Sequence, residues 1–428
     1  MTRIFRPRQL ASAGVAALLI LTAACGGNYP NSTFQPTTEF NRDTTAIWDQ
    51  MMFWGTIVFV IVEALLIIAM IRYRRRPNSP EPKHVHGNTA LEITWTVLPM
   101  FILAIIAVPT VRQIWKHQAP APADALQVQV IGHQWWWEFR YPQYNLVTAN
   151  ELYLPIGRPV NFELRTADVI HSFWIPALGG KRDLINNRTN HLWFMPDSTG
   201  ENAFNGSCNE FCGTSHANMR FRAYTVTEAN FESWARHQAG NAVFVPAAAP
   251  APAPAAGAPA GGTVPPQPVS STATAQTTPP ATVAPTTGFQ FPAERLGDHI
   301  VPRTPIPAGL SFNDAALATA DAQRGAAIYS RSACIGCHKV RGNPSSIGVL
   351  GPDLTHVASR HTIAGGFFPN DARHLARWVK NASKMKPGAK MNVMGKGEYE
   401  PMTKGIVAVG GLTDEQIADI VAYLMTLK

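Results

Sequence analysis

The chain has 428 residues and a formal net charge of +8, with 46% hydrophobic and 15% charged residues. The charged fraction lies well below the roughly 25% that is usual for soluble globular domains, as expected when long apolar segments are present. Aromatic residues make up 9% of the chain and include 11 Trp, which excludes a protein that is disordered throughout. The composition therefore disfavours a cytosolic globular protein.

The N-terminus has the three parts of an export signal. Three arginines precede an apolar run over residues 10–21, and small residues follow up to Cys25. This order predicts a signal peptide over residues 1–24. The stretch also resembles a bacterial lipoprotein signal, in which the Cys becomes the acylated first residue, although Thr22 departs from that pattern. Lipidation at Cys25 is the prediction, and ordinary cleavage or an uncleaved anchor is the alternative.

Most of the remaining positive charge lies in one short segment. Residues 72–91 hold four Arg and one Lys against one Glu, a net charge of +4, and the three arginines of the signal carry +3. Everything else in the chain therefore sums to +1. This distribution removes the main support for nucleic-acid binding and indicates a cytoplasmic loop between two membrane spans.

Two apolar segments flank that loop. Residues 51–71 carry a single charge, Glu63, and residues 93–111 carry none. Both lengths suit the roughly 30 Å hydrocarbon layer of a bilayer. We predict a transmembrane hairpin over 46–115, with the preceding segment 25–45 and everything after the hairpin on the extracytoplasmic side. An ionisable group inside a bilayer needs a partner or water, and the sequence assigns Glu63 no role.

The chain after the hairpin changes character twice. Residues 126–130 and 160–164 alternate apolar and polar side chains, which predicts strands of a β-sandwich or barrel over 119–236. A low-complexity linker rich in Pro, Ala and Thr follows over 240–309. The last unit, 310–428, reads as helical.

The last helix of that helical unit carries two signals. Thr413 can cap its N-terminus with Gln416 three residues later, and an apolar stripe follows.

Two cysteines in the helical unit form a haem-attachment motif. Cys334, Cys337 and His338 make C-x-x-C-H, in which two thiols add to the haem vinyl groups and the adjacent imidazole reaches the iron. A local disulfide with an incidental His is the alternative. The motif predicts a covalently bound haem c.

The other cysteine pair lies in the β-rich region. Cys208 and Cys212 share one stretch with His216 and Met219, and His171 lies 37 residues before Cys208. Thiolates, imidazoles and a thioether favour copper or zinc over magnesium or calcium. A blue-copper centre needs only one Cys, whereas two thiolates can bridge a pair of coppers. A Cys2His2 zinc site is the alternative, but it leaves Met219 unexplained.

These features together resemble a known family. The two spans, the segment 132–137 with its three consecutive Trp, the segment 171–176 and the cysteine loop are similar to subunit II of a haem-copper cytochrome c oxidase. Residues 310–428 resemble the cytochrome c domain that is fused to this subunit in caa-type oxidases. The resemblance implies a multi-domain membrane protein with a cupredoxin-like β-barrel or sandwich and an all-α class I cytochrome c domain.

The resemblance also implies the ligands of a binuclear copper centre, CuA. Cys208 and Cys212 would bridge the coppers, with His171 and His216 as terminal ligands. Met219 and the backbone carbonyl of Glu210 would be the weak axial ligands, and the Glu210 carboxylate would hold magnesium at the contact with subunit I. Quinol-oxidising relatives lack the copper ligands, whereas this chain keeps them.

Further roles follow from the same resemblance. Trp135 would be the electron-entry aromatic and Trp136 would lie over CuA with it, although Trp residues here can also simply fill a β-core. Glu92, at the cytoplasmic start of the second span, would form the entrance of a proton channel, and a solvated helix-terminal acid is the alternative.

The distal haem ligand is expected to be a thioether. The segment ending in Met391 resembles the one that carries this ligand in the family, but Asn392 replaces the usual Pro and leaves Met394 as a competitor. His356 is expected to pack near the haem rather than bind it. Tyr329 fits the aromatic that packs the first cytochrome helix on the last.

Neither span contains a His, so this chain cannot itself ligate an oxygen-reducing haem in the bilayer. The resemblance therefore implies the electron-relaying subunit of a proton-pumping oxidase in a bacterial inner membrane, as a multi-pass protein. Electrons would pass from haem c to CuA and then to subunit I, which reduces O2 to water. Subunit III and a donor such as cytochrome c or a quinol-oxidising complex would be further partners.

Two other functions remain open from the sequence. One is a stand-alone membrane-anchored electron carrier, which would not co-purify with a multi-span partner. The other is the equivalent subunit of a CuA-containing nitric oxide reductase, which assays with O2 and NO would distinguish.

Overall fold

The computed structural model describes residues 31–77, 81, 84, 86–197, 200–242 and 288–428. The predicted signal peptide and Cys25 lie outside these residues. The described chain divides into two compact units. The first runs up to Phe231 and also includes two later segments, Phe291–Thr304 and Ala364–Pro369, and the second comprises the rest.

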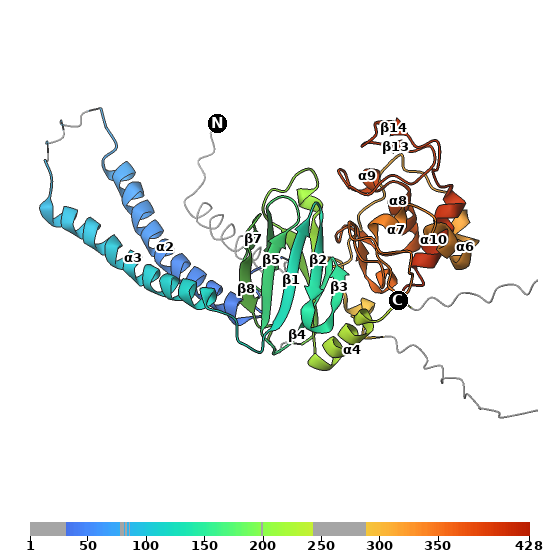
Figure 1. The fold of residues 1–428 in the computed structure, drawn as a ribbon. Coiled ribbons are helices and arrows are strands. Elements are labelled where there is room, and N and C mark those ends of the chain that lie inside the picture. Colours follow the sequence, from blue (N-terminus) through green and yellow to red (C-terminus); the bar gives the residue numbers. More distant parts are fainter. Residues whose placement is uncertain (1–30, 78–80, 82–83, 85, 198–199, 243–287) are drawn as a thin grey trace, which may run out of the picture. The chain divides into compact units, whose positions relative to one another are not determined.

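Two long apolar helices come first in the chain, α2 (Glu39–Arg72) and α3 (Thr89–Gln118) (Figure 1). Both are long and apolar enough to cross a membrane, and both extend past the predicted spans at each end. Their extracytoplasmic ends are held together by Lys116, whose ammonium contacts the carboxylates of Glu39 and Asp43 at 2.5 and 2.6 Å. The predicted hairpin is confirmed.

The β-domain consists of two five-stranded sheets, with the orders β3-β2-β1-β5-β8 and β4-β10-β9-β6-β7. Their strands are β1 (Leu126–His133), β2 (Trp136–Tyr141), β3 (Leu146–Ala149), β4 (Glu151–Pro155), β5 (Val160–Thr166), β6 (His171–Trp174), β7 (Arg182–Leu184), β8 (Asn190–Phe194), β9 (Asn202–Cys208) and β10 (Arg220–Val226). The alternation predicted along β1 and β5 appears as alternating burial of their side chains.

An aromatic core fills the space between the two sheets. Trp137 from one sheet packs edge-on against Phe173 from the other, with ring centroids 5.8 Å apart. Phe173 in turn stacks on Phe221 of β10 at 5.1 Å. All three side chains are fully buried. Because both sheets contribute to one apolar layer, they pack face to face as the predicted sandwich.

A segment from beyond the low-complexity region completes this domain. Phe291 is buried and stacks on Tyr224 of β10, with ring centroids 5.2 Å apart. Arg222, also on β10 and 1% exposed, donates to the carbonyl of Ile300. Phe291–Thr304, which composition assigns to the linker, therefore packs on the β-domain, because burial of Phe291 and Ile300 favours that contact.

The remaining elements are mostly short helices. They are α4 (Glu228–Ala239), α5 (Ala315–Ala318), α6 (Ala322–Tyr329), α7 (Cys334–Cys337), α8 (Ala372–Lys380), α9 (Ala382–Met385) and α10 (Asp414–Leu424), with the two-residue strands β11 (Thr362–Ile363), β12 (Phe368–Pro369), β13 (Tyr399–Glu400) and β14 (Gly405–Ile406). Of the short 3-10 turns, η1 (Pro142–Tyr144) lies between β2 and β3 and η2 (His216–Asn218) between β9 and β10, whereas η3 (Ala293–Arg295) and η4 (Val357–Ser359) lie later in the chain.

The second unit is organised by the crossing of α6 and α10. Thr413 and Gln416 form the predicted capping box at the start of α10. Tyr329 packs on Tyr423 with ring centroids 5.4 Å apart, as the sequence predicts for the first and last helices. A Cβ on Gly325 would lie 1.8 Å from the carbonyl oxygen of Asp419, so only glycine permits this close crossing.

Candidate metal and haem sites

Strand pairing brings the predicted copper ligands together. β6 pairs with β9 so that Phe173 faces Cys208, which places His171 near the end of β9. The loop that follows Cys208 returns through η2 to β10, and the amide of Cys208 donates to the carbonyl of Met219 at 3.0 Å. Both ends of the loop are therefore fixed by the sheet.

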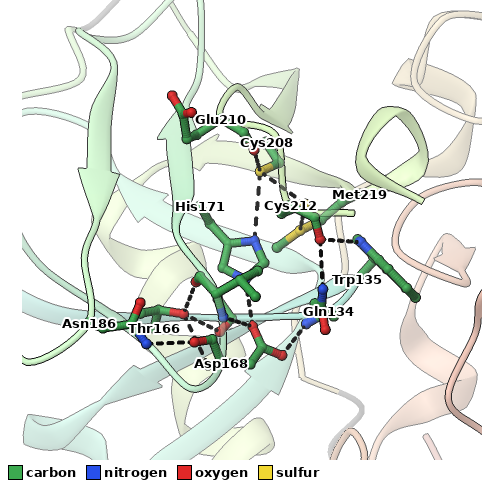
Figure 2. Close-up of polar contacts among 12 residues, drawn as sticks. Gln134, Trp135, Thr166, Asp168, His171, Asn186, Cys208, Glu210, Cys212 and Met219 are labelled. Atoms are coloured by element: carbon green, nitrogen blue, oxygen red, sulfur yellow. Dashed lines mark hydrogen bonds and ion pairs between the residues drawn. The ribbon is translucent and has the colours of Figure 1, made fainter. Parts of the chain in front are cut away.

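The side chains of this loop converge on one small volume (Figure 2). The Sγ atoms of Cys208 and Cys212 lie 3.7 Å apart. Each thiol has an imidazole beside it: Nδ1 of His171 is 3.8 Å from Cys208, and Nδ1 of His216 is 3.5 Å from Cys212. Sδ of Met219 is 3.8 Å from Cys212.

The sixth donor comes from the backbone. The carbonyl oxygen of Glu210 lies 3.3 Å from Sγ of Cys208, and the carboxylate of the same residue is exposed and points away from the sulfurs (Figure 2). The structure thus brings together all six groups that the sequence singles out for copper. It also separates the two functions expected of Glu210, because its carbonyl and carboxylate face different directions.

The chemistry of this donor set fits copper. Cys208 and Cys212 are both buried and form no disulfide. The hydrogen bond shared with Cys212 lowers the pKa of Cys208 to about 3, although burial acts against it. A thiolate is the form that binds metal. Met219 is fully buried, and its Sδ contacts Sγ of Cys212. A Cys2His2 zinc site would not need this thioether.

Asp168 orients the ring of His171, and sequence reasoning missed this residue. Its Oδ1 lies 2.8 Å from Nε2 of His171, so that Nδ1 faces the thiols. The other oxygen accepts from the amide of Gln134 at 2.7 Å. Burial alone would raise the pKa of Asp168, but the bonds from His171, Gln134 and the Val169 amide lower it to about 2. An Asp three residues before a ligand His was the available signal.

The three consecutive Trp occupy different environments. Nε1 of Trp135 donates to the carbonyl of Cys212 at 2.9 Å, and this carbonyl also accepts from the Gln134 amide side chain at 2.8 Å. Trp136 stacks on His133 with ring centroids 4.2 Å apart. Trp137 is fully buried in the core, which was the alternative prediction for these Trp residues. Trp135 is therefore hydrogen-bonded directly to the loop that carries Cys212.

The second unit contains the haem-attachment motif. Cys334 and Cys337 begin and end α7, and neither forms a disulfide. Nδ1 of His338 lies 2.9 Å from the carbonyl oxygen of Pro352, which leaves Nε2 for the iron. A Cβ on Gly351 would come within 2.6 Å of the His338 ring, so glycine allows this loop to approach it.

Apolar side chains near the motif are exposed, which also fits a haem. Ile347, Val349 and Leu350 are 74–77% exposed although they immediately precede the Gly351 loop. Such clustered apolar exposure is unusual in a soluble domain, and a planar apolar cofactor would cover it.

Both candidates for the distal ligand are accessible in part. Met385 is 1% exposed and belongs to the core, whereas Met391 and Met394 are half-buried. His356 is buried against the ring of His237, with centroids 4.7 Å apart, in keeping with a packing role.

Glu92 lies apart from these sites, in the first turn of α3. One of its carboxylate oxygens accepts from the amide of Asn88 at 3.3 Å. The carboxylate therefore lies against the N-terminus of α3.

The fold and the sites define a class: a membrane-anchored electron-transfer protein that joins a cupredoxin-like copper domain to a cytochrome c domain. Three family models match the chain in order. They are the transmembrane domain of cytochrome c oxidase subunit II over residues 30–112, its periplasmic domain over 144–226, and cytochrome c over 322–428.

Individual relatives agree with these matches. Cytochrome c oxidase subunit 2 of Alkalihalophilus pseudofirmus is 30% identical over 87% of this chain and 83% of its own length. The same subunit of Bacillus sp. strain PS3 is 29% identical over 83% and 80%. The solved periplasmic domain of oxidase subunit II of Bradyrhizobium japonicum has 32% identity over 27% of this chain and 95% of its own, with a TM-score of 0.26.

The chain belongs to the cytochrome c oxidase subunit II family. It is thus part of an oxidoreductase, a haem-copper terminal oxidase complex, in which it transfers electrons and partners the catalytic subunit I. The family domains imply copper and haem, a membrane anchor, and an extracytoplasmic position for the copper domain.

The contact between Asp168 and His171 generates a prediction. Asp168→Asn removes the negative charge behind the ligand imidazole, and outer-shell substitutions of this kind cost about 10–100-fold in metal affinity. We expect weaker copper binding and a raised reduction potential of the copper centre, measured by copper titration and redox titration of the purified chain. Asp124→Asn, which precedes β1 and leaves the Asp168 carboxylate in place, is the control. Unchanged affinity and potential in Asp168→Asn would show that Asp168 does not tune the ligand.

Proposed function

We propose that this chain accepts electrons on a covalent haem c and passes them through a binuclear CuA centre to the haem of subunit I. The observation that carries the proposal is the convergence of two thiols, two imidazoles, a thioether and a carbonyl at 3.3–3.8 Å. A pair of coppers sharing one electron would let the centre accept and donate electrons with little rearrangement of its ligands.

The residues would divide the work as follows. Cys208 and Cys212 would hold both metals, because their sulfurs lie side by side and each has its own imidazole. Met219 and the Glu210 carbonyl complete the two ends. Trp135 provides the path into the centre, because its indole is bonded directly to the backbone of Cys212.

The haem group would be held by three residues of one segment. Cys334 and Cys337 would attach the haem and His338 would bind its iron, with the orientation of the imidazole set by the Pro352 carbonyl. Met391 is the proposed distal ligand. When bound, the haem supplies a one-electron carrier with a potential kept high by the thioether.

Other parts of the proposal concern the assembly. The exposed carboxylate of Glu210 would hold magnesium at the contact with subunit I. Subunit III and a donor such as cytochrome c or a quinol-oxidising complex would complete the system. The chain would be a multi-pass protein of the bacterial inner membrane, exported by the signal peptide and lipidated at Cys25.

Metal analysis tests the copper proposal. The purified chain is expected to contain two copper ions and one haem iron, with a single unpaired electron shared by both coppers in the oxidised state. Electron paramagnetic resonance and elemental analysis measure these properties. In Cys212→Ser one bridging sulfur is lost, so the shared spin should disappear while the haem remains. A single zinc or one isolated copper in the unaltered chain would exclude CuA.

A second test concerns the distal haem ligand. Met391 follows a Pro-Gly turn, Pro387 and Gly388, whose bend can direct a side chain back towards the iron. Met391→Ala should abolish the sulfur-to-iron absorption band and lower the haem potential, because thioether ligation favours the ferrous state. Haem attachment should survive. Met394→Ala is the matched control and should keep the band. If Met394→Ala loses the band and Met391→Ala keeps it, the distal ligand is Met394.

The third test addresses Glu92, which we propose as the entrance of a proton channel into subunit I. Glu92→Gln should slow steady-state O2 reduction by the complex, because proton uptake is impaired. The rate of electron transfer from haem c to CuA, measured by stopped-flow absorption, should stay unchanged. Both centres would lie on the opposite side of the membrane from Glu92. Full turnover in Glu92→Gln would identify this residue as a helix-terminal acid only.

A further inference from the structure

The methionine proposed as the distal haem ligand lies on a short segment that is neither helix nor strand. Met391 and Met394 are both half-buried, and Asn392, which replaces the Pro of the related segment, is exposed. A Pro would fix the backbone φ angle directly after Met391, and Asn does not. Another restraint is therefore needed if the Met391 side chain is to keep one direction.

A turn fixes the side of this segment that precedes Met391. The amide of Ala389 donates to the carbonyl of Lys386 at 3.0 Å, which closes the Pro-Gly turn. The hydroxyl of Ser383, on α9, donates to the carbonyl of Ala389 at 3.3 Å. The backbone is therefore held two residues before Met391.

A buried carboxylate fixes the side that follows Met391. One oxygen of Glu400, on β13, accepts from the amide of Val393 at 2.7 Å, and the other accepts from the amide of Met402 at 3.1 Å. Glu400 and Val393 are 8% and 5% exposed. Hydrogen bonds to a carboxylate are stronger than those to a neutral carbonyl, and a buried site strengthens them further. Met391 therefore lies between two fixed points, each two residues away.

The hairpin that carries Glu400 lies mostly at the surface. β13 and β14 pair with each other over two residues each, and a two-stranded hairpin of this kind is only marginally stable by itself. Its apolar side chains Tyr399, Met402 and Ile406 are 49–70% exposed, so apolar burial does little to hold it. The inward-facing Glu400 carboxylate therefore connects this hairpin to the segment that carries Met391.

The backbone at Met394 is held by other bonds. Its carbonyl accepts from the amide of Leu412 at 2.7 Å. The amide of the next residue, Gly395, donates at 2.9 Å to the carbonyl of Lys380, the last residue of α8. Loss of the Glu400 carboxylate would therefore release the segment next to Met391 and leave Met394 anchored.

We propose that Glu400 is a positioning residue for the distal haem ligand, because its bond to the Val393 amide keeps the Met391 side chain directed at the iron. This role rests on the distal ligation by Met391 proposed above. It gives the β13–β14 hairpin a function: a restrained thioether keeps its place against water or an added ligand, whereas a loose one does not.

Competition by imidazole tests this role in the purified full-length chain with haem attached. In Glu400→Ala the Val393 amide loses its acceptor, so imidazole should displace the thioether from the oxidised haem at an about tenfold lower concentration. The sulfur-to-iron absorption band should weaken before imidazole is added. Glu400→Gln offers one acceptor oxygen to two amides and should give an intermediate affinity. If Glu400→Ala does not retain haem, the same comparison is made with Glu400→Gln.

Glu398→Ala is the control from the same hairpin. The Glu398 carboxylate accepts from Asn381 at 2.9 Å and from Lys384 at 3.2 Å, which lie before the Met391 segment. This variant should keep the band and the imidazole affinity of the unaltered chain.

Three results would contradict the proposal. Equal changes in Glu398→Ala and Glu400→Ala would mean that a loosened hairpin accounts for both. Unchanged imidazole binding in the Glu400 variants would show that Met391 needs no help from this carboxylate, while methionine ligation itself would stand. Absence of the sulfur band from the unaltered chain would instead reject methionine ligation, and the role of Glu400 with it.

Discussion

The pairing of β9 with two neighbours is the constraint on which the copper site depends. β6 on one side brings His171, and β10 on the other side begins directly after Met219, so the loop between Cys208 and Met219 is closed at both ends by sheet hydrogen bonds. Sheet hydrogen bonds at both ends restrain the side chains that this loop carries. Small reorganisation is the property that an electron carrier needs, and the sandwich core beneath the loop provides the stiffness.

The membrane divides the chain into parts with different chemistry. All proposed redox groups are in the domains that follow α3, and the proposed proton entrance, Glu92, is at the opposite end of that helix. The hairpin itself holds no haem ligand, since neither span contains a His. The two helices therefore serve the copper domain as its membrane anchor.

Several parts of the site were predictable because their ligands are local in sequence. Cys208, Cys212, His216 and Met219 lie within twelve residues, and C-x-x-C-H is a five-residue motif. The role of Asp168 was missed, because the three-residue spacing to His171 does not say which ring nitrogen meets the carboxylate and which faces the sulfurs. Nor did composition reveal that Phe291–Thr304 packs on the β-domain, since Phe291 and Ile300 find their partners on strands that lie far away in the sequence.

The sequence by itself predicted the two spans and their orientation, the alternation of the β-strands, the residue types of both cysteine motifs and the capping of the last helix. These are effects of hydropathy, charge and short spacing, which act between near neighbours. Only the tertiary structure decided which Trp bonds to the copper loop, which acid supports a ligand imidazole, and which acid bonds to the segment that carries Met391. Each of these depends on side chains from separate elements meeting at hydrogen-bond distance, and no local pattern encodes that meeting.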